Sequence, residues 1–177
     1  MKVLVLGELI IDEYSWGDCH KISPEAPVAI ANIQREEIRA GGAANVIANM
    51  LSIGTEVYSI GINCEDQELI EKILVSFGKC NFKYLNANIK NYPKKQRILS
   101  SSQQLLRIDR NDIFTLDKKC MATYINKAVK LASKVDLIII SDYNKGLITK
   151  ELVEKIVLFK EKNKVPIFVD TKRTNGE

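Results

Sequence analysis

Histidine is almost absent from the chain, and cysteines never occur as a closely spaced pair. The only histidine among the 177 residues is His20, and the four cysteines stand at positions 19, 64, 80 and 120 without a CxxC pattern. This spacing argues against a zinc site, which needs clustered cysteine or histidine ligands. It also leaves little basis for Ser-His-Asp catalysis. We expect His20 to be an incidental surface residue and the cysteines to be reduced, buried small apolar side chains.

The sequence also lacks long hydrophobic runs and a strong excess of charge of one sign. The opening stretch MKVLVLGELII is apolar but short, and it contains Glu8, so it predicts a buried strand rather than a membrane span. The net charge of +4 is spread along the chain, which argues against nucleic-acid binding and suits a mildly basic pocket for an anionic metabolite. Cysteines scattered in this way, without a signal peptide, indicate a cytoplasmic protein.

The remaining pattern predicts an α/β fold in which strands alternate with helices. Apolar runs predict core strands at 2–7, 56–62, 135–141 and 165–170, and helical patterns cover 43–53, 67–78, 116–133 and 149–163, the last with Thr149 as N-cap. This order implies a parallel sheet with helices on both faces. Two polar segments with short strand patterns interrupt it, and we expect them to form a small separate sheet that covers a site.

Candidate site residues follow from the rule that ligands of open α/β sheets bind beyond the carboxyl ends of the strands. The sequence contains neither GxxxxGK[ST] nor GxGxxG, so no standard phosphate-binding loop is available to guide the choice. The rule selects residues rich in hydrogen-bonding groups after the first strand, around the first helix and after the last two strands: Asp12, Gly41, Gly42, Asn45, Ser141, Asp142, Tyr143, Lys145, Gly146, Asp170 and Lys172.

Each of these candidates also has a purely structural interpretation, which the sequence leaves open. Asp12 suits a solvated strand end, and Gly41-Gly42 suits a tight turn before a helix. Asp142 and Asp170 suit helix caps or turns. Asn45 is the least easily explained in this way, because asparagine is weakly disfavoured inside helices.

Taken together, several motifs resemble the ribokinase-type sugar kinases. The blocks LGELIIDEY and GGAANVIANMLSIG, at 6–14 and 41–54, mark the broad family. The blocks KISPEAPV, QQLLRID and SDYNKG resemble more specifically the bacterial D-glycero-β-D-manno-heptose 7-phosphate kinases, which make ADP-heptose for the lipopolysaccharide core. The resemblance runs from Val3 to Thr174. It implies a ribokinase-like fold with a β-sheet lid near 13–34 and 82–109, which in this family also pairs two subunits.

The resemblance also implies roles for individual residues. The double glycine would let the backbone lie against the sugar, and Asn45 and Asp12 would hydrogen-bond its hydroxyls. Asp142 and Lys145 are further candidates for the substrate. Asp170 and Lys172 are candidates for the cofactor, ATP with Mg²⁺. The candidates for the substrate's phosphate lie in or just after the second lid segment: Lys95, Arg97 and Arg107.

One part of the family pattern is absent from this sequence. The glycine-rich GAGD-like turn, which forms the anion hole and supplies the catalytic base, does not occur between residues 1 and 177. We therefore expect the N-terminal, sugar-binding half of one kinase domain, without the nucleotide-binding half and with little ability to bind ATP. Two alternatives remain open: a kinase of another sugar phosphate or a nucleoside, and a non-catalytic sugar-phosphate-binding or dimerisation module.

Overall fold

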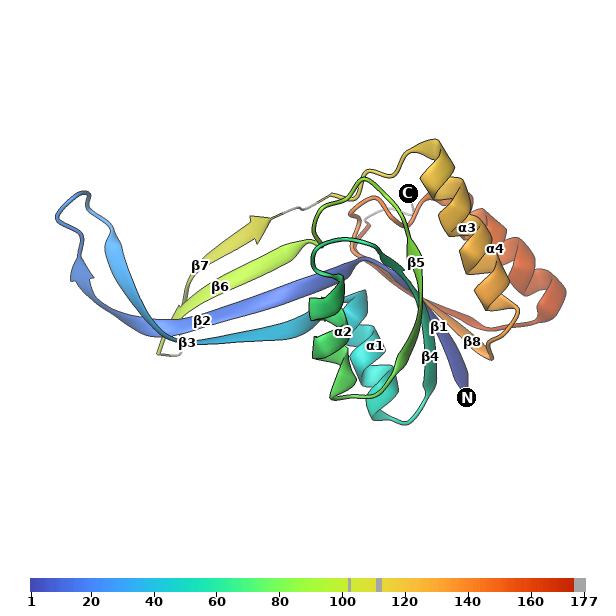
Figure 1. Ribbon diagram of the computed structural model, residues 1–177, viewed down its shortest axis with the longest axis horizontal. Helices are drawn as coiled ribbons and strands as arrows, with labels where there is room; N and C mark the ends of the chain where they lie inside the picture. Colours follow the sequence, from blue (N-terminus) through green and yellow to red (C-terminus); the bar gives the residue numbers. More distant parts are fainter. Residues whose placement is uncertain (102, 111–112, 174–177) are drawn as a thin grey trace.

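The computed structural model describes the whole chain except residues 102, 111–112 and 174–177. Thr174, where the resemblance ends, therefore lies outside the described residues. The fold has two parts, a sheet with helices on both faces and a long, bare sheet that projects from it (Figure 1). None of the helices in the described part of the chain is long and apolar enough to cross a membrane.

The main sheet has five parallel strands in the order β5-β4-β1-β8-β9. Its central strand β1 is buried on both sides: Leu4 and Leu6 pack in one core, and Val3 and Val5 pack in the other. This alternation is the period-2 pattern of a strand with a helical layer on each face. The strands are β1 (Lys2–Gly7), β4 (Glu56–Ile62), β5 (Cys80–Leu85), β8 (Leu137–Asp142) and β9 (Ile167–Thr171).

The helices form one layer on each face of the main sheet (Figure 1). Helices α1 (Ala43–Ser52) and α2 (Gln67–Val75) cover one face, and α3 (Lys118–Ala132) and α4 (Lys150–Asn163) cover the other. The expected N-cap at Thr149 is confirmed, since its hydroxyl accepts from the Leu152 backbone N–H at 3.3 Å. The predicted α/β class, a parallel sheet with helices on both faces, is likewise confirmed.

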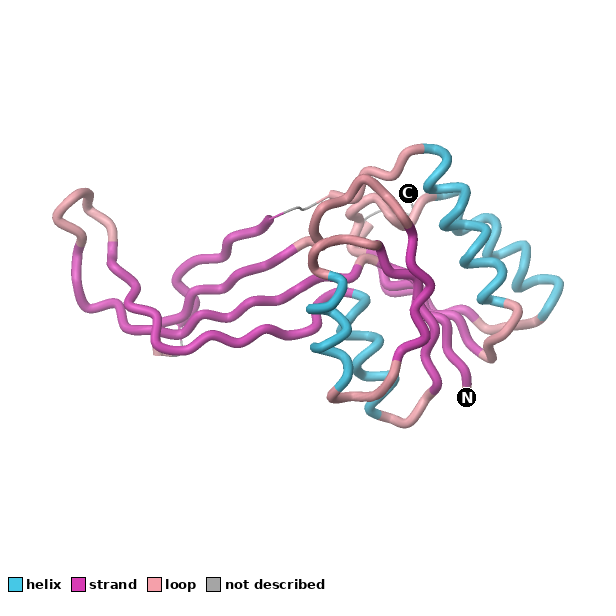
Figure 2. The backbone as a smooth tube through the Cα atoms, viewed as in Figure 1, coloured by secondary structure: helices cyan, strands magenta, loops and turns pink. Residues whose placement is uncertain are grey.

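The second sheet, which we call the lid, consists almost entirely of strand (Figure 2). Its order is β3-β2-β6-β7, with β2 parallel to β6 and the other two pairs antiparallel. The strands are β2 (Leu9–Ile22), β3 (Ala29–Gly42), β6 (Lys94–Ser100) and β7 (Gln103–Arg110).

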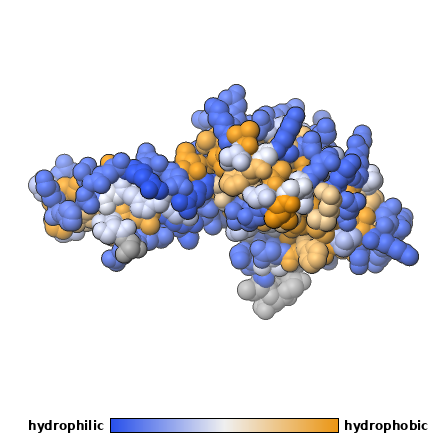
Figure 3. Space-filling view, turned by 90° about the horizontal axis from the view of Figure 1, so that it is seen from below, coloured by the Kyte–Doolittle hydropathy of each residue, from blue (hydrophilic) through white to orange (hydrophobic). Residues whose placement is uncertain are grey.

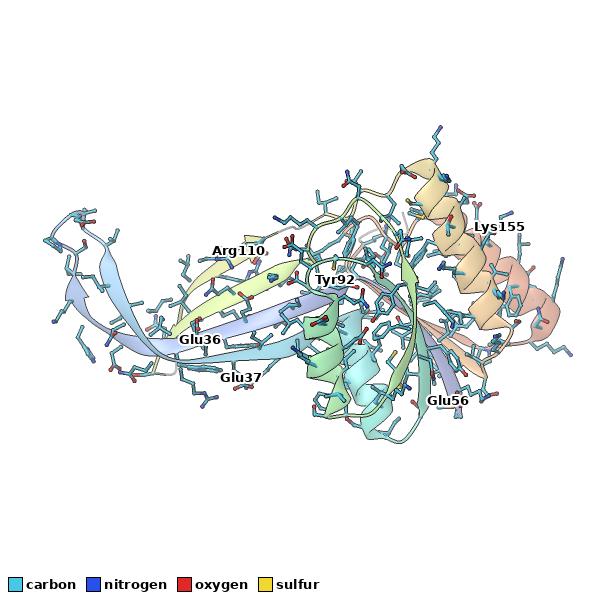
Figure 4. The ribbon with its side chains drawn as sticks, in the orientation of Figure 1. Glu36, Glu37, Glu56, Tyr92, Arg110 and Lys155 are labelled. Atoms are coloured by element: carbon cyan, nitrogen blue, oxygen red, sulfur yellow. The ribbon has the colours of Figure 1, made fainter. Side chains whose placement is uncertain are left out.

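The lid differs from the sequence expectation in two respects. Its first two strands have 14 residues each, where short strands within 13–34 were expected. The second expected segment, 82–109, is divided: β5 belongs to the main sheet, and the lid resumes only at Lys94. Tyr92 is 1% exposed and lies in one of the two cores rather than in the lid (Figure 4).

Candidate functional site

Asp12 lies inside the lid strand β2 rather than at the end of the first core strand, where the sequence pattern placed it. In the lid register it stands between Arg39 of β3 and Lys95 of β6. Directly paired residues of neighbouring strands share one face of a sheet, so these three side chains belong to the same face of the lid. Asp12 therefore belongs to the lid base, where the lid joins the main sheet.

The Asp12 carboxylate is held by an arginine of the next lid strand. Oδ1 accepts a hydrogen bond from Nη1 of Arg97 at 2.8 Å, and the two side chains are 19% and 21% exposed. Partial burial alone would lower the pKa of the Arg97 guanidinium, but the hydrogen bond and charge of Asp12 raise it above its usual value. The same guanidinium stands 5.1 Å from the ring centroid of Tyr14. The pair thus fixes one carboxylate oxygen and leaves Oδ2 out of this ion pair.

Glycine is favoured at the first two positions of the GGAAN block for different structural reasons. A Cβ atom at Gly41 would lie 2.5 Å from Oδ2 of Asp12, so a larger residue there would displace that carboxylate. Gly42 has φ of 55° and ψ of −135°, and a Cβ there would lie 2.5 Å from the Glu8 carbonyl oxygen. The bare backbone at Gly41 and the Asp12 carboxylate are therefore immediate neighbours.

Asn45 is exposed on the first turn of α1. It borders a cavity of about 450 Å³ that also touches Arg39 and Ala40 of β3 and Lys72 and Phe77 near α2. The amide is therefore accessible from solvent beside the edge strand of the lid. This exposure agrees with a ligand-facing role better than with a cap, because the helix N-cap is Gly42.

Glu8 is a functional candidate that the sequence analysis missed. Its side chain is fully buried, and its two carboxylate oxygens accept the backbone N–H groups of Tyr143 at 2.9 Å and Leu147 at 3.1 Å. Its own carbonyl accepts the Ala43 N–H at 2.9 Å, at the start of α1. Glu8 thus ties the SDYNKG loop to the glycine block. The available signal was a carboxylate within an apolar run, since buried charges need dedicated partners.

Asp142 is only 4% exposed, and its carboxylate is already occupied. Oδ1 accepts the Asn144 N–H at 2.8 Å, and Oδ2 accepts from the Thr171 hydroxyl at 3.0 Å and from Nε of Arg173 at 2.7 Å. These contacts join the ends of β8 and β9. The structural interpretation that the sequence left open for this residue is thus the one that the geometry favours.

Tyr143 brings the lid and the main sheet together. The ammonium nitrogen of Lys95, from β6, lies 5.8 Å from its ring centroid, and that of Lys172, just after β9, lies 5.9 Å from it. Burial raises the pKa of the Tyr143 phenol, and the nearby carboxylates of Asp170 and Asp12 raise it further. The structure therefore gathers residues from both lid and sheet around this one ring.

The two remaining basic candidates, Arg107 and Lys145, make other contacts. Arg107 is opposite Arg97 in the lid register, but its guanidinium binds both oxygens of Asp109, at 2.8 and 3.1 Å, and is about half exposed. Lys145 lies in the loop after β8, where its carbonyl accepts the Phe114 N–H at 2.6 Å.

The expectations for histidine and cysteine have mixed outcomes. His20 is an exposed lid residue near Asp18, as expected. The prediction that all four cysteines are buried is wrong, because each is only partly buried. Cys80 comes nearest to it, since burial raises the pKa of its thiol to about 12. In the described ranges, no cluster of three or more histidine, cysteine or acidic side chains could hold a metal ion.

Solved structures show which known fold this geometry matches. A carbohydrate kinase from Agrobacterium tumefaciens superposes with a TM-score of 0.69 at 17% identity, covering 95% of this chain and 52% of that one. Phosphofructokinase-2 from Escherichia coli in complex with fructose-6-phosphate gives 0.67 at 12% identity, over 98% and 55%. Arabidopsis thaliana ribokinase complexed with ribose and ATP gives 0.63 at 15%, over 97% and 54%. At these identities the likeness establishes the fold.

The sequence is also similar to those of known bacterial proteins. The chain is 37% identical over 171 residues to "Bifunctional protein HldE" of Nitratiruptor sp. and 38% identical over 177 residues to that of Aliarcobacter butzleri. The chain is a homologue of the HldE proteins with a ribokinase-like fold. Each match covers 97% of the chain and 36% of the HldE protein, so the chain spans about a third of these relatives. No family model matches the sequence.

Proposed function

We propose that the chain is the sugar-binding part of an ATP-dependent kinase that phosphorylates the anomeric hydroxyl of D-glycero-D-manno-heptose 7-phosphate, a step toward ADP-heptose and the lipopolysaccharide core. The observation that carries this proposal is the Asp12 carboxylate, which lies at the lid base beside the bare backbone of Gly41. A carboxylate with one oxygen outside its ion pair is an acceptor for sugar hydroxyls. The ribokinase-like fold and the HldE homology support the reaction class.

In this proposal the sugar lies between the glycine block and the lid. Asp12 accepts from its hydroxyls, Gly41 and Gly42 let the ring approach the backbone, and the exposed amide of Asn45 supplies a further donor and acceptor. The 7-phosphate lies against the basic side chains of the lid, for which Lys95, Arg97 and Arg107 are the candidates. Asp142 orients the adjoining loop rather than contacting the sugar, because its oxygens are occupied.

ATP and Mg²⁺ belong to the complete enzyme in this proposal. ATP supplies the phosphoryl group when bound. Asp170 and Lys172, both exposed at the carboxyl end of β9, offer it a carboxylate and an ammonium group, which suit a metal–water shell and a phosphate. Phosphoryl transfer depends mainly on positioning and electrostatic stabilisation, and this chain contributes the positioning of the acceptor sugar. We place the enzyme in the cytoplasm, where ATP is available.

A non-catalytic role is the alternative that a specific observation favours. The lid offers a long strand edge at β3, which suits a dimerisation or sugar-phosphate-binding module as well as a kinase. A kinase of another sugar or nucleoside remains the second alternative, since the residues around Asp12 recognise hydroxyl groups in general.

The test is calorimetric titration of the chain with D-glycero-D-manno-heptose 7-phosphate. We expect wild type to bind and Asp12→Ala to lose affinity by about 10- to 100-fold, because hydrogen bonds to a charged acceptor are removed. Asp18→Ala is the matched control, since this carboxylate stands on the same strand toward the lid tip. Normal binding by Asp12→Ala, with an unchanged circular dichroism spectrum, would contradict the proposal.

A further inference from the structure

Two lysines from different parts of the fold converge on the ring of Tyr143. Lys95 belongs to the lid strand β6, and Lys172 follows the last strand of the main sheet. Their ammonium nitrogens lie 5.8 and 5.9 Å from the ring centroid, within the range of a cation–π contact. The ring therefore has two ammonium groups beside it, and their positive charges attract an anion.

These two lysines differ from the neighbouring arginines in their pairing. Arg97 binds Asp12, and Arg107 binds Asp109 through both carboxylate oxygens. Within the described residues, neither Lys95 nor Lys172 forms an ion pair. Their charges, unlike those of Arg97 and Arg107, are therefore not already paired with a carboxylate. Asp12 and Asp170 lie close enough to influence the Tyr143 phenol, so a ligand here meets hydroxyl acceptors beside the ammonium groups.

Tyr143 is held in place by the main sheet. Its backbone N–H donates to the buried Glu8 carboxylate at 2.9 Å, and the next residue, Asn144, has φ of 55° with its N–H bound to Asp142 at 2.8 Å. Lys95, by contrast, belongs to the lid. The ring of Tyr143 is thus held by the main sheet, and both Lys95 of the lid and Lys172 after β9 contact it.

We infer that Tyr143 is the positioning residue of a phosphate clamp, in which Lys95 and Lys172 bind one phosphate group between them and so hold the lid against the main sheet. For the phosphate of the sugar, this rests on the proposed function; the phosphate of ATP is the other source of the same chemistry. The phenol of Tyr143 stays neutral at physiological pH because its pKa is raised, so no phenolate opposes the anion. Recognition of the phosphate then depends on the two ammonium groups, because the guanidinium of Arg97 is already paired with Asp12.

Lysine labelling tests the clamp without any sugar. Tyr143→Leu keeps an apolar side chain and the backbone contact to Glu8 but removes the ring face, whereas Tyr143→Phe keeps the ring. We expect acetic anhydride to modify Lys95 and Lys172 roughly two- to five-fold faster in Tyr143→Leu than in wild type, the factor that a cation–π contact corresponds to. Tyr143→Phe should match wild type, and exposed Lys90 is the internal reference.

Inorganic phosphate is the ligand probe in the same experiment. It should protect Lys95 and Lys172 in wild type and in Tyr143→Phe, and protect them less in Tyr143→Leu. Unchanged labelling of both lysines in Tyr143→Leu, or equal protection in all three proteins, would overturn the clamp.

Calorimetry with three ligands separates the clamp from the proposed function. Tyr143→Leu should weaken heptose 7-phosphate, ATP, or both, and leave unphosphorylated heptose unchanged; the ligand that weakens identifies the source of the phosphate. Equal weakening of phosphorylated and unphosphorylated heptose, with no effect on ATP, refutes the clamp and leaves the proposed function standing. If wild type binds neither heptose, the proposed function fails, and protection by inorganic phosphate still decides the clamp.

Discussion

Gly41 and Gly42 are adjacent, yet a side chain at each would be disfavoured for a different reason. Gly42 has a positive φ, which is a local backbone requirement and the kind of feature that a GG pair in a sequence indicates. Gly41 leaves space for a carboxylate 29 positions earlier in the chain, on the neighbouring lid strand. Only the second of these requirements connects the glycine block to a candidate ligand site.

Long-range contacts explain which site residues the sequence could predict. Asn45 and the glycines were selectable because a helix start is a local feature, whereas Asp12 was selected as a strand end and instead lies inside β2. Glu8 was missed because its partners, Tyr143 and Leu147, lie more than 130 residues away. Asp142 was selected for its position, but its pairing with Arg173 and Thr171 depends on the register between β8 and β9, which no local pattern specifies.

A prediction at this scale concerns Glu37, which lies on the lid (Figure 4). Both Arg35 and Arg39 contact its carboxylate. The hydrogen bonds from Arg39 and Arg35 lower the pKa of Glu37 from 4.5 to about 2. A lowered pKa in the folded state stabilises the fold above pH 4.5, and this contribution is lost as the pH falls toward 2. Glu37→Gln should therefore be less stable than wild type near neutrality, and the two should converge at the acid end.

Thermal unfolding across this pH range, followed by circular dichroism, measures the effect. The Glu37 side chain is partly exposed to solvent, so added salt should shrink the difference between the two proteins. A difference that remains constant down to pH 2, or that does not respond to salt, would contradict the assignment.

At the scale of elements, the periodicity of apolar residues predicted the helices and most of the main sheet well, but it predicted the lid strands poorly. The four helices and four of the five main-sheet strands stand close to their predicted ranges, and most of them bury an apolar stripe or run in one of the two cores. The exception is β5, which the sequence placed partly in the lid. The lid strands are largely exposed or half-buried on both faces, so their sequences carry no strict alternation. Their length is set by pairing with each other, which a single sequence reveals poorly.

The attachment of the lid to the main sheet gives a second prediction. Lys94, the first residue of β6, pairs with Asp66 before α2 at 2.7 Å, and the side chains are only 20% and 8% exposed. Asp66 also accepts the Tyr92 N–H at 3.1 Å, which Asn in its place can still do. Asp66→Asn should lower the free energy of unfolding by about 3 kcal/mol, because a largely buried lysine loses its partner.

Urea unfolding compares this variant with a neighbouring control. Glu65→Gln removes the exposed pair with Lys90, and it should change stability by less than about 1 kcal/mol. Equal effects of the two substitutions would show that the Lys94–Asp66 pair does not anchor the lid.

At the scale of the whole molecule, the lid presents surface that this chain does not cover. Its exposed apolar residues include Ile33, Ile38, Leu105 and Leu106, and apolar groups interrupt its hydrophilic surface (Figure 3). Two of the aromatic residues expected there are elsewhere: Phe82 is in the main sheet, and Tyr92 is in the core. Tyr14 and Trp16 stack on each other at 5.5 Å with arginines over their rings.

We predict a homodimer formed through the lid, because an open strand edge and exposed aliphatic side chains favour pairing. Sedimentation equilibrium should show dimers, and Ile38→Lys combined with Leu106→Lys should convert them to monomers. Val157→Lys, on the exposed side of α4, is the control for a dimer through another face. Monomers only, at high protein concentration, would contradict the prediction.

The last prediction concerns turnover by the 177-residue chain on its own. Transfer from ATP requires donors for the charge that develops on the γ-phosphate, and a base near the acceptor hydroxyl. Within this sequence the carboxylates at the candidate site already have partners: Asp12 binds Arg97 and, in the proposed function, the sugar, and Asp142 binds Arg173 and Thr171. Asp170 alone remains, exposed, and the GAGD-like turn that the family uses does not occur.

Losing a single oxyanion-type donor slows a reaction by about 100-fold or more, so a chain without the whole turn should show no useful rate. A coupled assay with ATP, Mg²⁺ and heptose 7-phosphate, run beside calorimetry, should find sugar-phosphate binding without turnover. ATP hydrolysis that depends on the sugar would contradict this, since it would mean that the residues present supply both base and anion stabilisation. Asp170→Asn would then be the first variant to examine, because its carboxylate is exposed at the end of β9 and close enough to Tyr143 to raise its pKa.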